Sequence, residues 1–339
     1  MSILRFKLLL IWLFSLSAVI ATVQILSLLA DNPYHSKQRD FELQANRIEA
    51  IVLGTSHSKA IHFPSLKIPG FSYHDAGSDV QSASDKYQAI APLMPNLKYV
   101  LLPISPAFLH LVWSDEINTN REKNIYANYP KYSNFHGSLY WTLLLNKSEY
   151  TLQKLRLYFR KKLKALLPHS QSSYDPLSCM PIWSGNKSHE DGFINGYADA
   201  YADPQCIEKL AEITVKSHAK YSVNKKDTQS NFKHNTKEIT AMIDVLARHQ
   251  HQLILFIPPF TAEYYDHKIW ATVKAENRRY LEKISQEPNV TFIDYHDLFY
   301  KRNYLETNTL FYDDDHLGLK GAKEFSKILG RDIRQLESQ

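Results

Sequence analysis

The sequence predicts an α/β protein in which a parallel sheet carries helices on both faces. Short apolar runs alternate with longer stretches whose apolar residues recur at helical spacing, which is typical of strand–helix–strand units. The chain has 339 residues, of which 44% are hydrophobic and 22% charged, enough for one large domain or two smaller ones. Its formal net charge of +5 is too small to indicate a nucleic-acid partner.

The first part of the chain predicts three strands. Residues 50–53 form a wholly apolar run, residues 71–74 form a weaker strand, and residues 98–104 form the third. Residues 82–93 between them have helical character, and Pro95 ends that helix because proline cannot continue a helical hydrogen-bond ladder.

The last part of the chain continues the alternation. A helix is expected at 235–249, where four apolar residues share one face: Ile239, Met242, Ile243 and Leu246. A fourth strand follows at 252–257 and a fifth at 290–294, with a helix at 268–285 between them. Residues 318–336 form the closing helix.

Residues 107–231 interrupt this alternation. They are rich in Tyr, Asn, Ser and Trp and contain few apolar runs, so we expect an insertion between the third and fourth strands. Loops at the carboxyl ends of parallel strands carry ligand contacts in open α/β sheets, and the insertion is therefore expected to cap the site. The α/β domain then comprises residues 48–106 and 232–339, preceded by a polar linker at 31–47.

One stretch inside the insertion, residues 150–167, predicts a separate amphipathic helix. Five apolar residues recur at helical spacing among six lysines and arginines. Such a helix is expected either to lie on an anionic membrane surface or to pack its apolar stripe on the domain.

The N-terminal residues 1–30 predict a membrane anchor. Residues 8–30 contain no charge and are long enough to cross a ~30 Å hydrocarbon core as a helix. Arg5 and Lys7 precede this run, which places the N-terminus in the cytoplasm and the C-terminal domain outside, in the periplasm. We therefore expect a single-pass protein of the cytoplasmic membrane. The alternative is a cleaved signal peptide, whose apolar region is usually only ~7–15 residues long.

The two cysteines, Cys179 and Cys206, are expected to form a disulfide in an oxidising compartment. The alternative is two unpaired small hydrophobic residues. There is no Cys-x-x-Cys motif, and the acidic and histidine residues at 189–191 lack a second matching group. We therefore predict no metal, and no cofactor.

Two short motifs indicate a serine nucleophile with its base. Ser56 directly follows the first expected strand, in Gly-Thr-Ser-His-Ser, and Asp313 and His316 form an Asp-x-x-His pair near the C-terminus. A serine hydroxyl needs a positioned base, usually His, and a third group that holds that His in the right tautomer. The spacing lets Asp313 contact one ring nitrogen of His316 while the other faces Ser56. The alternative explanation of residues 313–315 is a solvated acidic cluster at a helix N-terminus.

These motifs resemble those of the SGNH, or GDSL-type, hydrolases. Gly54-Thr55-Ser56 is similar to their Gly-Asp-Ser block, and Asp313-x-x-His316 to their terminal block. Residues 74–78 stand where the block with the oxyanion-hole glycine is expected. The resemblance covers roughly residues 48–105 and 235–335 and implies a three-layer sandwich with about five parallel strands. It also implies Ser56 as nucleophile, His316 as base, Asp313 as its orienter, and the backbone amides of Ser56 and Gly77 as oxyanion donors.

The sequence departs from the superfamily pattern in two places. Thr55 replaces the usual Asp, and the Gly-x-Asn-Asp block is missing, since residues 101–106 read Leu-Leu-Pro-Ile-Ser-Pro. The Asn amide of that block donates to the oxyanion, and losing one such donor costs ~10²–10³ in rate. Ser105 is the candidate replacement.

The departures and the expected anchor and insertion resemble a membrane-anchored, extracytoplasmic branch of the superfamily. That branch includes the alginate and cellulose O-acetylation proteins and the D-alanyl transfer protein of teichoic acid synthesis. It implies a serine esterase or O-acyltransferase acting on acyl groups of a cell-envelope polysaccharide or glycolipid, with a multi-spanning membrane acyltransferase as partner. His57 is a candidate substrate contact or a structural neighbour. The alternative function is a catalytically impaired module that binds glycan or such an acyltransferase.

Overall fold

The computed structural model describes residues 33–74, 78–111, 204–223, 228–300 and 310–337. It also describes two short strands, β4 (Lys187–Ser188) and β5 (Ile194–Asn195), and isolated positions between 7 and 22. The chain divides into two compact units, one of Met1–Ser36 and Asn118–Asp175, the other of Lys37–Ile117 and Pro176–Gln339. The sheet and the candidate site belong to the second unit.

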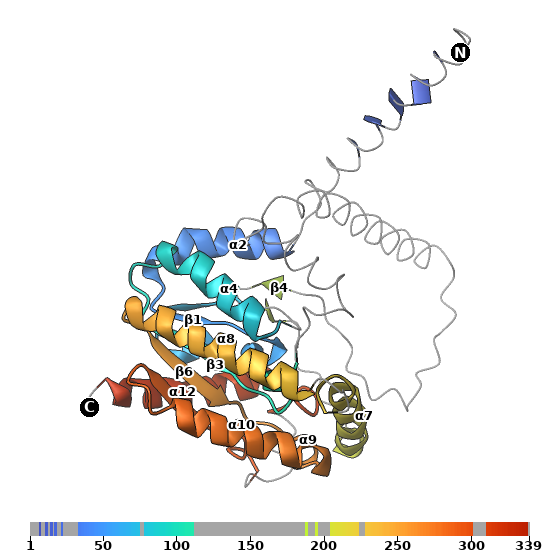
Figure 1. Cartoon of the computed structure of the whole chain (residues 1–339), viewed down its shortest axis with the longest axis vertical. Helices are drawn as coiled ribbons and strands as arrows, with labels where there is room; N and C mark the ends of the chain where they lie inside the picture. Colours follow the sequence, from blue (N-terminus) through green and yellow to red (C-terminus); the bar gives the residue numbers. More distant parts are fainter. Residues whose placement is uncertain are drawn as a thin grey trace. The chain divides into compact units, whose positions relative to one another are not determined.

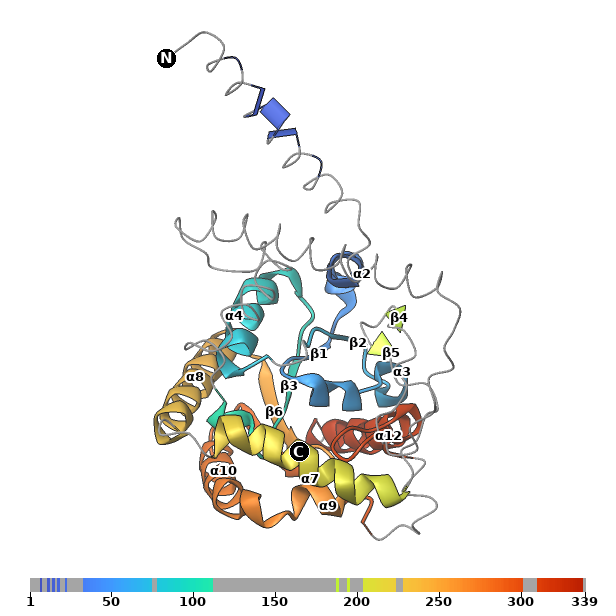
Figure 2. The ribbon, with the colours of Figure 1, turned by 90° about the vertical axis from the view of Figure 1, so that its right-hand side faces the viewer.

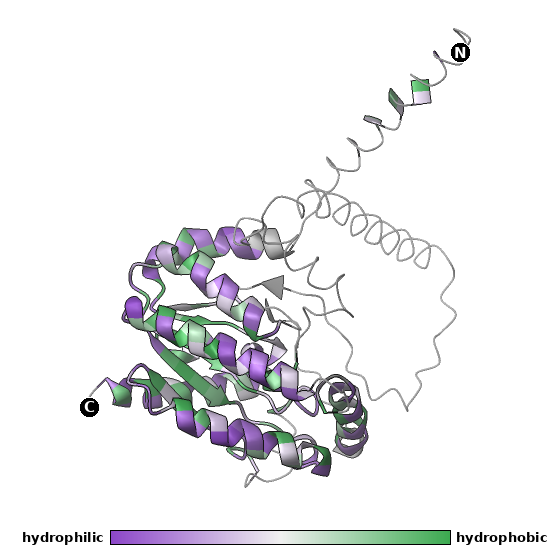
Figure 3. Ribbon diagram, viewed as in Figure 1, coloured by the Kyte–Doolittle hydropathy of each residue, from purple (hydrophilic) through white to green (hydrophobic). Residues whose placement is uncertain are grey.

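The centre of this unit is a five-stranded sheet, and all its strand pairs are parallel (Figure 1). The strand order is β2-β1-β3-β6-β7. The strands are β1 (Ala50–Val52), β2 (Gly70–Ser72), β3 (Tyr99–Pro103), β6 (Gln252–Ile257) and β7 (Val290–Asp294). Strands β1, β3 and β6 are almost wholly buried and read as apolar runs, as expected for parallel strands covered on both faces (Figure 3). The predicted parallel α/β sheet is confirmed.

Helices cover both faces of the sheet, which confirms the three-layer architecture. Figure 2 shows α4 (Val80–Ile90), α8 (Thr228–Arg248) and α10 (Ala271–Ile284) on one face, and α3 (Phe63–Leu66) and α12 (Leu319–Leu336) on the other. The crossovers connecting parallel strands require such helices, because a parallel pair cannot be joined by a tight turn.

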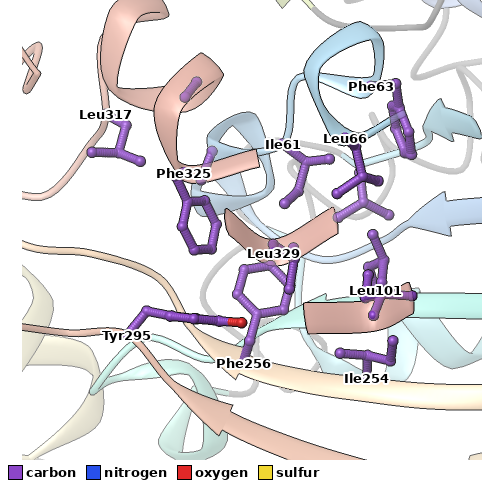
Figure 4. Close-up of a cluster of buried hydrophobic side chains, with 14 of the residues drawn as sticks. Ile61, Phe63, Leu66, Leu101, Ile254, Phe256, Tyr295, Leu317, Phe325 and Leu329 are labelled. Carbon is purple, nitrogen blue, oxygen red and sulfur yellow. The ribbon is translucent and has the colours of Figure 1, made fainter. Parts of the chain in front are cut away.

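A cluster of buried apolar side chains fills the layer between the sheet and helices α3 and α12 (Figure 4). Phe325 of α12 is fully buried, 5.8 Å from the ring of Phe256 and 5.2 Å from that of Tyr295. Gly330 lets α12 approach α3 closely, since a Cβ there would lie only 2.1 Å from the carbonyl oxygen of Leu66. This packing holds α12 in place beside the sheet.

Tertiary contacts accompany two helical segments that the periodicity did not predict. Helix α8 begins at Thr228, earlier than the predicted residue 235, because Phe232 stacks on His110 and the Asn235 amide donates to the carbonyls of Leu109 and Leu111. Within the predicted linker, the chain forms helix α2 (Pro33–Gln44), whose Phe41 packs against the rings of Phe71 in β2 and Tyr73 directly after it. Neither contact is visible in local periodicity.

Part of the predicted insertion belongs to the same unit as the sheet. Helix α7 (Pro204–Ser222) packs against α9 (Ala262–Tyr265) and the short helix η4 (Phe108–His110). These follow β6 and β3, so α7 lies at the carboxyl ends of the strands (Figure 2). Most of the rest of 107–231, including 150–167 and Cys179, lies outside the described residues. The cap over the site and the Cys179–Cys206 disulfide stay predictions.

The predicted anchor, residues 8–30, also lies largely outside the described part of the chain. No helix among the residues that the structure describes is long and apolar enough to cross a membrane. The anchor and the extracytoplasmic location therefore stay predictions.

Candidate active site

The loop after β1 presents Ser56 at the carboxyl edge of the sheet. Gly54 has a φ of +100°, a conformation that only glycine adopts readily, and it turns the chain sharply out of the strand. Ser56 then opens the short helix η2 (Ser56–Ala60), where Thr55 is the N-cap and accepts from the His57 amide. The buried Ser58 hydroxyl donates to the carbonyl of Leu53 at 2.6 Å and ties the turn to the strand end. Ser56 itself is only half-buried and lines a small pocket.

A tight loop before α12 presents His316 opposite Ser56. Phe311 and Leu317 pair as an isolated antiparallel bridge, and the amide of Gly318 donates to the carbonyl of Leu310 at 2.8 Å. Inside this loop, the Asp313 Oδ1 atom accepts from the amides of Asp315 (3.1 Å) and His316 (2.7 Å). The loop is therefore fixed at both ends and in the middle.

The structure brings together the three residues that the motifs predict. The Nε2 atom of His316 lies 2.8 Å from the Ser56 Oγ, although the two residues are 260 positions apart. The opposite ring nitrogen, Nδ1, lies 3.0 and 3.1 Å from the two carboxylate oxygens of Asp313. Ser56, His316 and Asp313 are thus connected in the order that a serine nucleophile, its base and the orienting carboxylate require.

Asp315 is a site residue that the sequence reasoning missed. Its Oδ1 lies 2.8 Å from His316 Nδ1, and its Oδ2 lies 3.2 Å from His57 Nε2. Its side chain is only 3% exposed. The neighbouring Asp314 is also buried and accepts from the Thr214 hydroxyl of α7 at 3.0 Å. The alternative of a solvated N-cap cluster is wrong, because two of the three aspartates are buried and the N-cap of α12 is Gly318.

His57 stacks on the base. Its ring lies parallel to that of His316, at 8° with 4.8 Å between centroids, and the edge of Phe260 packs nearby at 5.3 Å. Its Nδ1 lies 3.1 Å from the Thr55 hydroxyl and its Nε2 contacts Asp315. Both ring nitrogens have partners within the protein, and the substrate contact that was one prediction for this residue stays a prediction.

The buried charges set the protonation states of the site. Burial would lower the pKa of His316, but the carboxylates of Asp313 and Asp315 raise it well above its ordinary value. Burial lowers the pKa of His57, against the opposing effect of Asp315. For Asp314, burial and the two neighbouring aspartates raise the pKa to about 8. Burial would also raise the pKa of Asp315, but the two histidines hold it well below its usual range.

A small pocket gives access to the Ser56–His316 pair. It is lined by Ser56, His57, Lys59, Ala60, Pro258, Pro259, Asp315, His316 and Leu317. The two prolines follow β6, so the pocket lies where strand ends and their loops meet, as ligand sites do in open α/β sheets. Lys59 brings a cationic side chain to the same wall.

For two predicted oxyanion donors, Gly77 and Ser105, the described residues show no contact with Ser56 or His316. Gly77 lies outside the described residues. Ser105 follows β3, is buried, and its carbonyl accepts from the Phe108 amide. Among the described hydrogen bonds, none connects the Ser105 hydroxyl with Ser56 or His316. Both residues therefore stay predictions as donors.

The side chains that could hold a metal are engaged with one another. His57, Asp315 and His316 bring ligand-type atoms within 4.8 Å, as do the three consecutive aspartates. In each set, carboxylates contact imidazole nitrogens or accept from Thr214. These contacts account for both clusters, and the prediction of no metal stays a prediction.

Helices α7 and α9 supply further groups that no motif indicated. His218 of α7 accepts from or donates to the Tyr264 hydroxyl at 2.9 Å, and its Nδ1 lies 3.9 Å from Asp315 Oδ2. The Thr261 hydroxyl donates to the Asp314 carbonyl at 2.6 Å. His218 lies in the segment predicted as an insertion, where neither spacing nor composition distinguished it.

Comparison with known proteins identifies one domain family. Residues 186–331 match the model of the "SGNH domain (fused to AT3 domains)". The match includes Asp313 and His316 but not Ser56. No curated protein matches the sequence.

Two solved structures are similar at low identity. One, provisionally described as a platelet activating factor from Streptococcus pneumoniae, is 11% identical, with a TM-score of 0.39 over 92% of this chain and 98% of that one. The other, a lipase from a goat rumen metagenome, is 10% identical, with a TM-score of 0.36 over 83% and 95% of the two chains.

Proposed function

We propose that the chain is a serine esterase or O-acyltransferase of the SGNH superfamily, whose nucleophile is Ser56. The observation that carries the proposal is the continuous connection from Ser56 Oγ through His316 to Asp313. The domain family and the fold support a hydrolase or acyl-transfer enzyme. The roles of the individual residues and the substrate are proposals.

The proposed reaction has two acyl transfers. Neutral His316 takes the Ser56 proton on Nε2 while Oγ attacks the acyl carbonyl carbon, which gives a tetrahedral oxyanion. The ester C–O bond then breaks, the leaving alcohol takes the proton from His316, and an acyl-serine remains. In the second half, His316 takes a proton from water or from a sugar hydroxyl while that oxygen attacks the acyl carbon. His316 then returns the proton to Ser56 Oγ as the acyl–Oγ bond breaks, which restores the free serine. Water gives hydrolysis and a sugar hydroxyl gives transfer.

The charge state of His316 determines when this can start. Because two carboxylates raise its pKa, the resting imidazole holds a proton on each nitrogen near neutral pH, and Nε2–H then donates to Ser56. Deprotonation reverses that hydrogen bond and makes Ser56 the donor. We therefore expect activity to rise with pH on the alkaline side of the ordinary histidine pKa.

The oxyanion would be bound by the amides of Ser56 and Gly77. The asparagine that ordinarily adds a side-chain donor is missing after β3. With one oxyanion donor fewer, the rate of hydrolysis is expected to be ~10²–10³ lower than with the complete set of donors. Slow hydrolysis is compatible with transfer, because an acyl-enzyme that resists water persists until a sugar acceptor arrives.

We further propose a location and a partner. Residues 8–30 would anchor the protein in the cytoplasmic membrane, with the catalytic domain in the periplasm facing an acylated cell-envelope polysaccharide or glycolipid. The matched domain family is one described as fused to AT3 domains. This favours a membrane acyltransferase as the partner of this chain, which matches the SGNH domain of that family.

The experiment is labelling of the purified full-length chain with a fluorophosphonate, combined with p-nitrophenyl acetate hydrolysis. Ser56 is expected to be the labelled residue, and Ser56→Ala to remove both labelling and turnover. The matched control is Ser65→Ala. Ser65 is also half-buried and hydrogen-bonded to a histidine, His62, at 2.9 Å, so its loss tests whether a serine–histidine contact alone is enough.

The proposal is wrong if Ser56 stays unlabelled between pH 7 and 10 while a control esterase reacts fully. That result would favour the catalytically impaired binding module, which the missing asparagine also motivates. Labelling of Ser56 without p-nitrophenyl acetate turnover supports an acyl-enzyme that waits for a sugar acceptor.

A further inference from the structure

We propose that Asp315 and His57 form a second carboxylate–imidazole pair, which positions His316 together with Asp313. The proposal rests on the proposed function, since it concerns the base of that reaction. It assigns a positioning role to two buried residues, one of which no motif indicated.

The geometry places Asp315 between two imidazoles. One carboxylate oxygen lies 2.8 Å from His316 Nδ1, and the other lies 3.2 Å from His57 Nε2. The two rings are parallel within 8°, at a centroid distance of 4.8 Å. A single carboxylate therefore holds the base and a second ring stacked on the base, which restricts rotation of His316 about its side-chain bonds.

The contacts of His57 fix its tautomer. Ionised Asp315 only accepts, so the proton of neutral His57 must be on Nε2. Nδ1 is then the acceptor, and the Thr55 hydroxyl at 3.1 Å is its donor. The Thr55 hydroxyl oxygen in turn accepts a hydrogen bond from the backbone amide of His57 at 3.4 Å. Thr55 therefore suits this tautomer better than the usual Asp. An ionised Asp only accepts, so at this position it would favour a proton on Nδ1 of His57 instead of Nε2.

Asp313 and Asp315 differ in what else they bind. Asp313 also accepts two backbone amides, those of Asp315 and His316, and its side chain is 19% exposed. Asp315 is 3% exposed, and its described contacts are with imidazoles. Asp313 therefore fixes the loop and the direction of His316, while Asp315 supplies a charge in a drier environment, where its field is screened less.

Other ionisable groups surround this arrangement. Helix η2 contributes His57 and Lys59, helix α7 contributes His218, helix α9 contributes Tyr264, and the loop contributes Asp313 and Asp314. Burial lowers the pKa of His57 and also that of His218, which leaves both rings neutral near pH 7. Asp315 remains charged because the two histidines hold its pKa well below the usual range, although burial opposes this. The pair therefore consists of an ionised carboxylate and a neutral ring.

This arrangement has a consequence for the reaction. An imidazolium forms on His316 when Ser56 attacks, and a second carboxylate stabilises it. The same charge raises the pKa of His316, so it moves the acidic limb of the pH–rate profile to higher pH. Removing Asp315 should therefore lower the rate at the plateau and extend activity to lower pH.

The experiment measures kcat and KM for p-nitrophenyl acetate against pH with the full-length chain. Asp315→Asn keeps the shape of the side chain and removes its charge. We expect the acidic limb of kcat/KM to move down by about 1–3 pH units, with a lower plateau. For His57→Leu we expect kcat to fall about 10–100-fold with KM unchanged, because Asp315 loses its donor. His57→Gln, whose amide can reach Asp315, should keep most of the rate.

A second measurement separates this proposal from the proposed function. The His316 ring is titrated by NMR in histidine-labelled protein, with His316→Gln for assignment, and this needs no turnover. Its pKa should fall in Asp315→Asn whether or not the chain is an enzyme. Circular dichroism shows which variants fold, and His57→Gln replaces His57→Leu if that variant does not.

The outcomes are distinct. If the wild-type protein is active, and Asp315→Asn changes neither its pH profile nor the His316 titration, the Asp315 proposal alone is overturned. A rise in KM without a change in kcat for His57→Leu also overturns it, because it would make His57 a substrate contact. An unlabelled, inactive wild type overturns the proposed function, while a lowered His316 pKa in Asp315→Asn still supports the buried pair.

Discussion

The loop at 313–316 and the apolar layer beneath α12 meet at Leu317, which belongs to that layer, but they bury different kinds of side chain. The loop buries Asp314, Asp315 and much of His316, whereas the layer buries rings such as Phe325 and Phe256 (Figure 4). In the layer, each large side chain removed from water contributes ~1.5–3 kcal/mol. In the loop, partnered charges contribute little net stability, because desolvation offsets their attraction.

The difference shows how one helix serves both regions. Packing of α12 against α3 and the sheet fixes where the loop ends, and this lets His316 meet Ser56 at 2.8 Å. The loop itself is held by its own hydrogen bonds and by Thr261. Stability and chemistry should therefore separate when the two regions are changed one at a time.

The largest expected effect is on activity alone. Ser56→Ala should lower kcat/KM by at least ~10³-fold, because the residue that forms the covalent intermediate is lost. The melting temperature should change by no more than a few degrees, since Ser56 is half-buried and its partner His316 keeps its carboxylates. Calorimetry and the ester assay on the same preparation test this, and a large loss of stability would contradict the separation of the two regions.

A change in the apolar layer should have the reverse effect. Phe325→Ala should lower the free energy of unfolding by ~3–5 kcal/mol, because it leaves a cavity between Phe256 and Tyr295. Protein that remains folded should keep its Ser56 labelling rate. Chemical denaturation gives the first quantity, and labelling well below the transition gives the second. The exposed Leu43→Ala is the control and should cost little.

The smallest expected effect concerns Asp314 and is seen only as a function of pH. Its folded pKa of about 8 lies above the unfolded value of ~3.9, so the folded state keeps a proton that the unfolded state loses. Stability should therefore fall as pH rises from ~4 to ~8. Asp314→Asn should remove that slope and be more stable than wild type at pH 8 by roughly 1–3 kcal/mol.

Denaturation at a series of pH values checks this slope. Asp244→Asn, at an exposed position on α8, is the matched control and should leave the slope as it is in wild type. A wild-type stability that does not change between pH 5 and 8 would show that Asp314 ionises normally in the folded protein.

The sequence by itself determined the sheet, its helices and the pair Ser56 and His316. Residues 252–257 and 290–294 form strands with the predicted bounds. The first is an almost wholly buried apolar run, as expected for a strand covered on both faces, whereas the second is only partly buried at the edge of the sheet. The motifs predicted that Ser56, Asp313 and His316 lie together, and the structure brings them into contact. Only the tertiary structure decided that Asp315, and not Asp313 alone, contacts His316, and that His57 stacks on it. In three consecutive aspartates, spacing cannot tell which carboxylates turn inward, since that depends on the partners that the fold places beside each one.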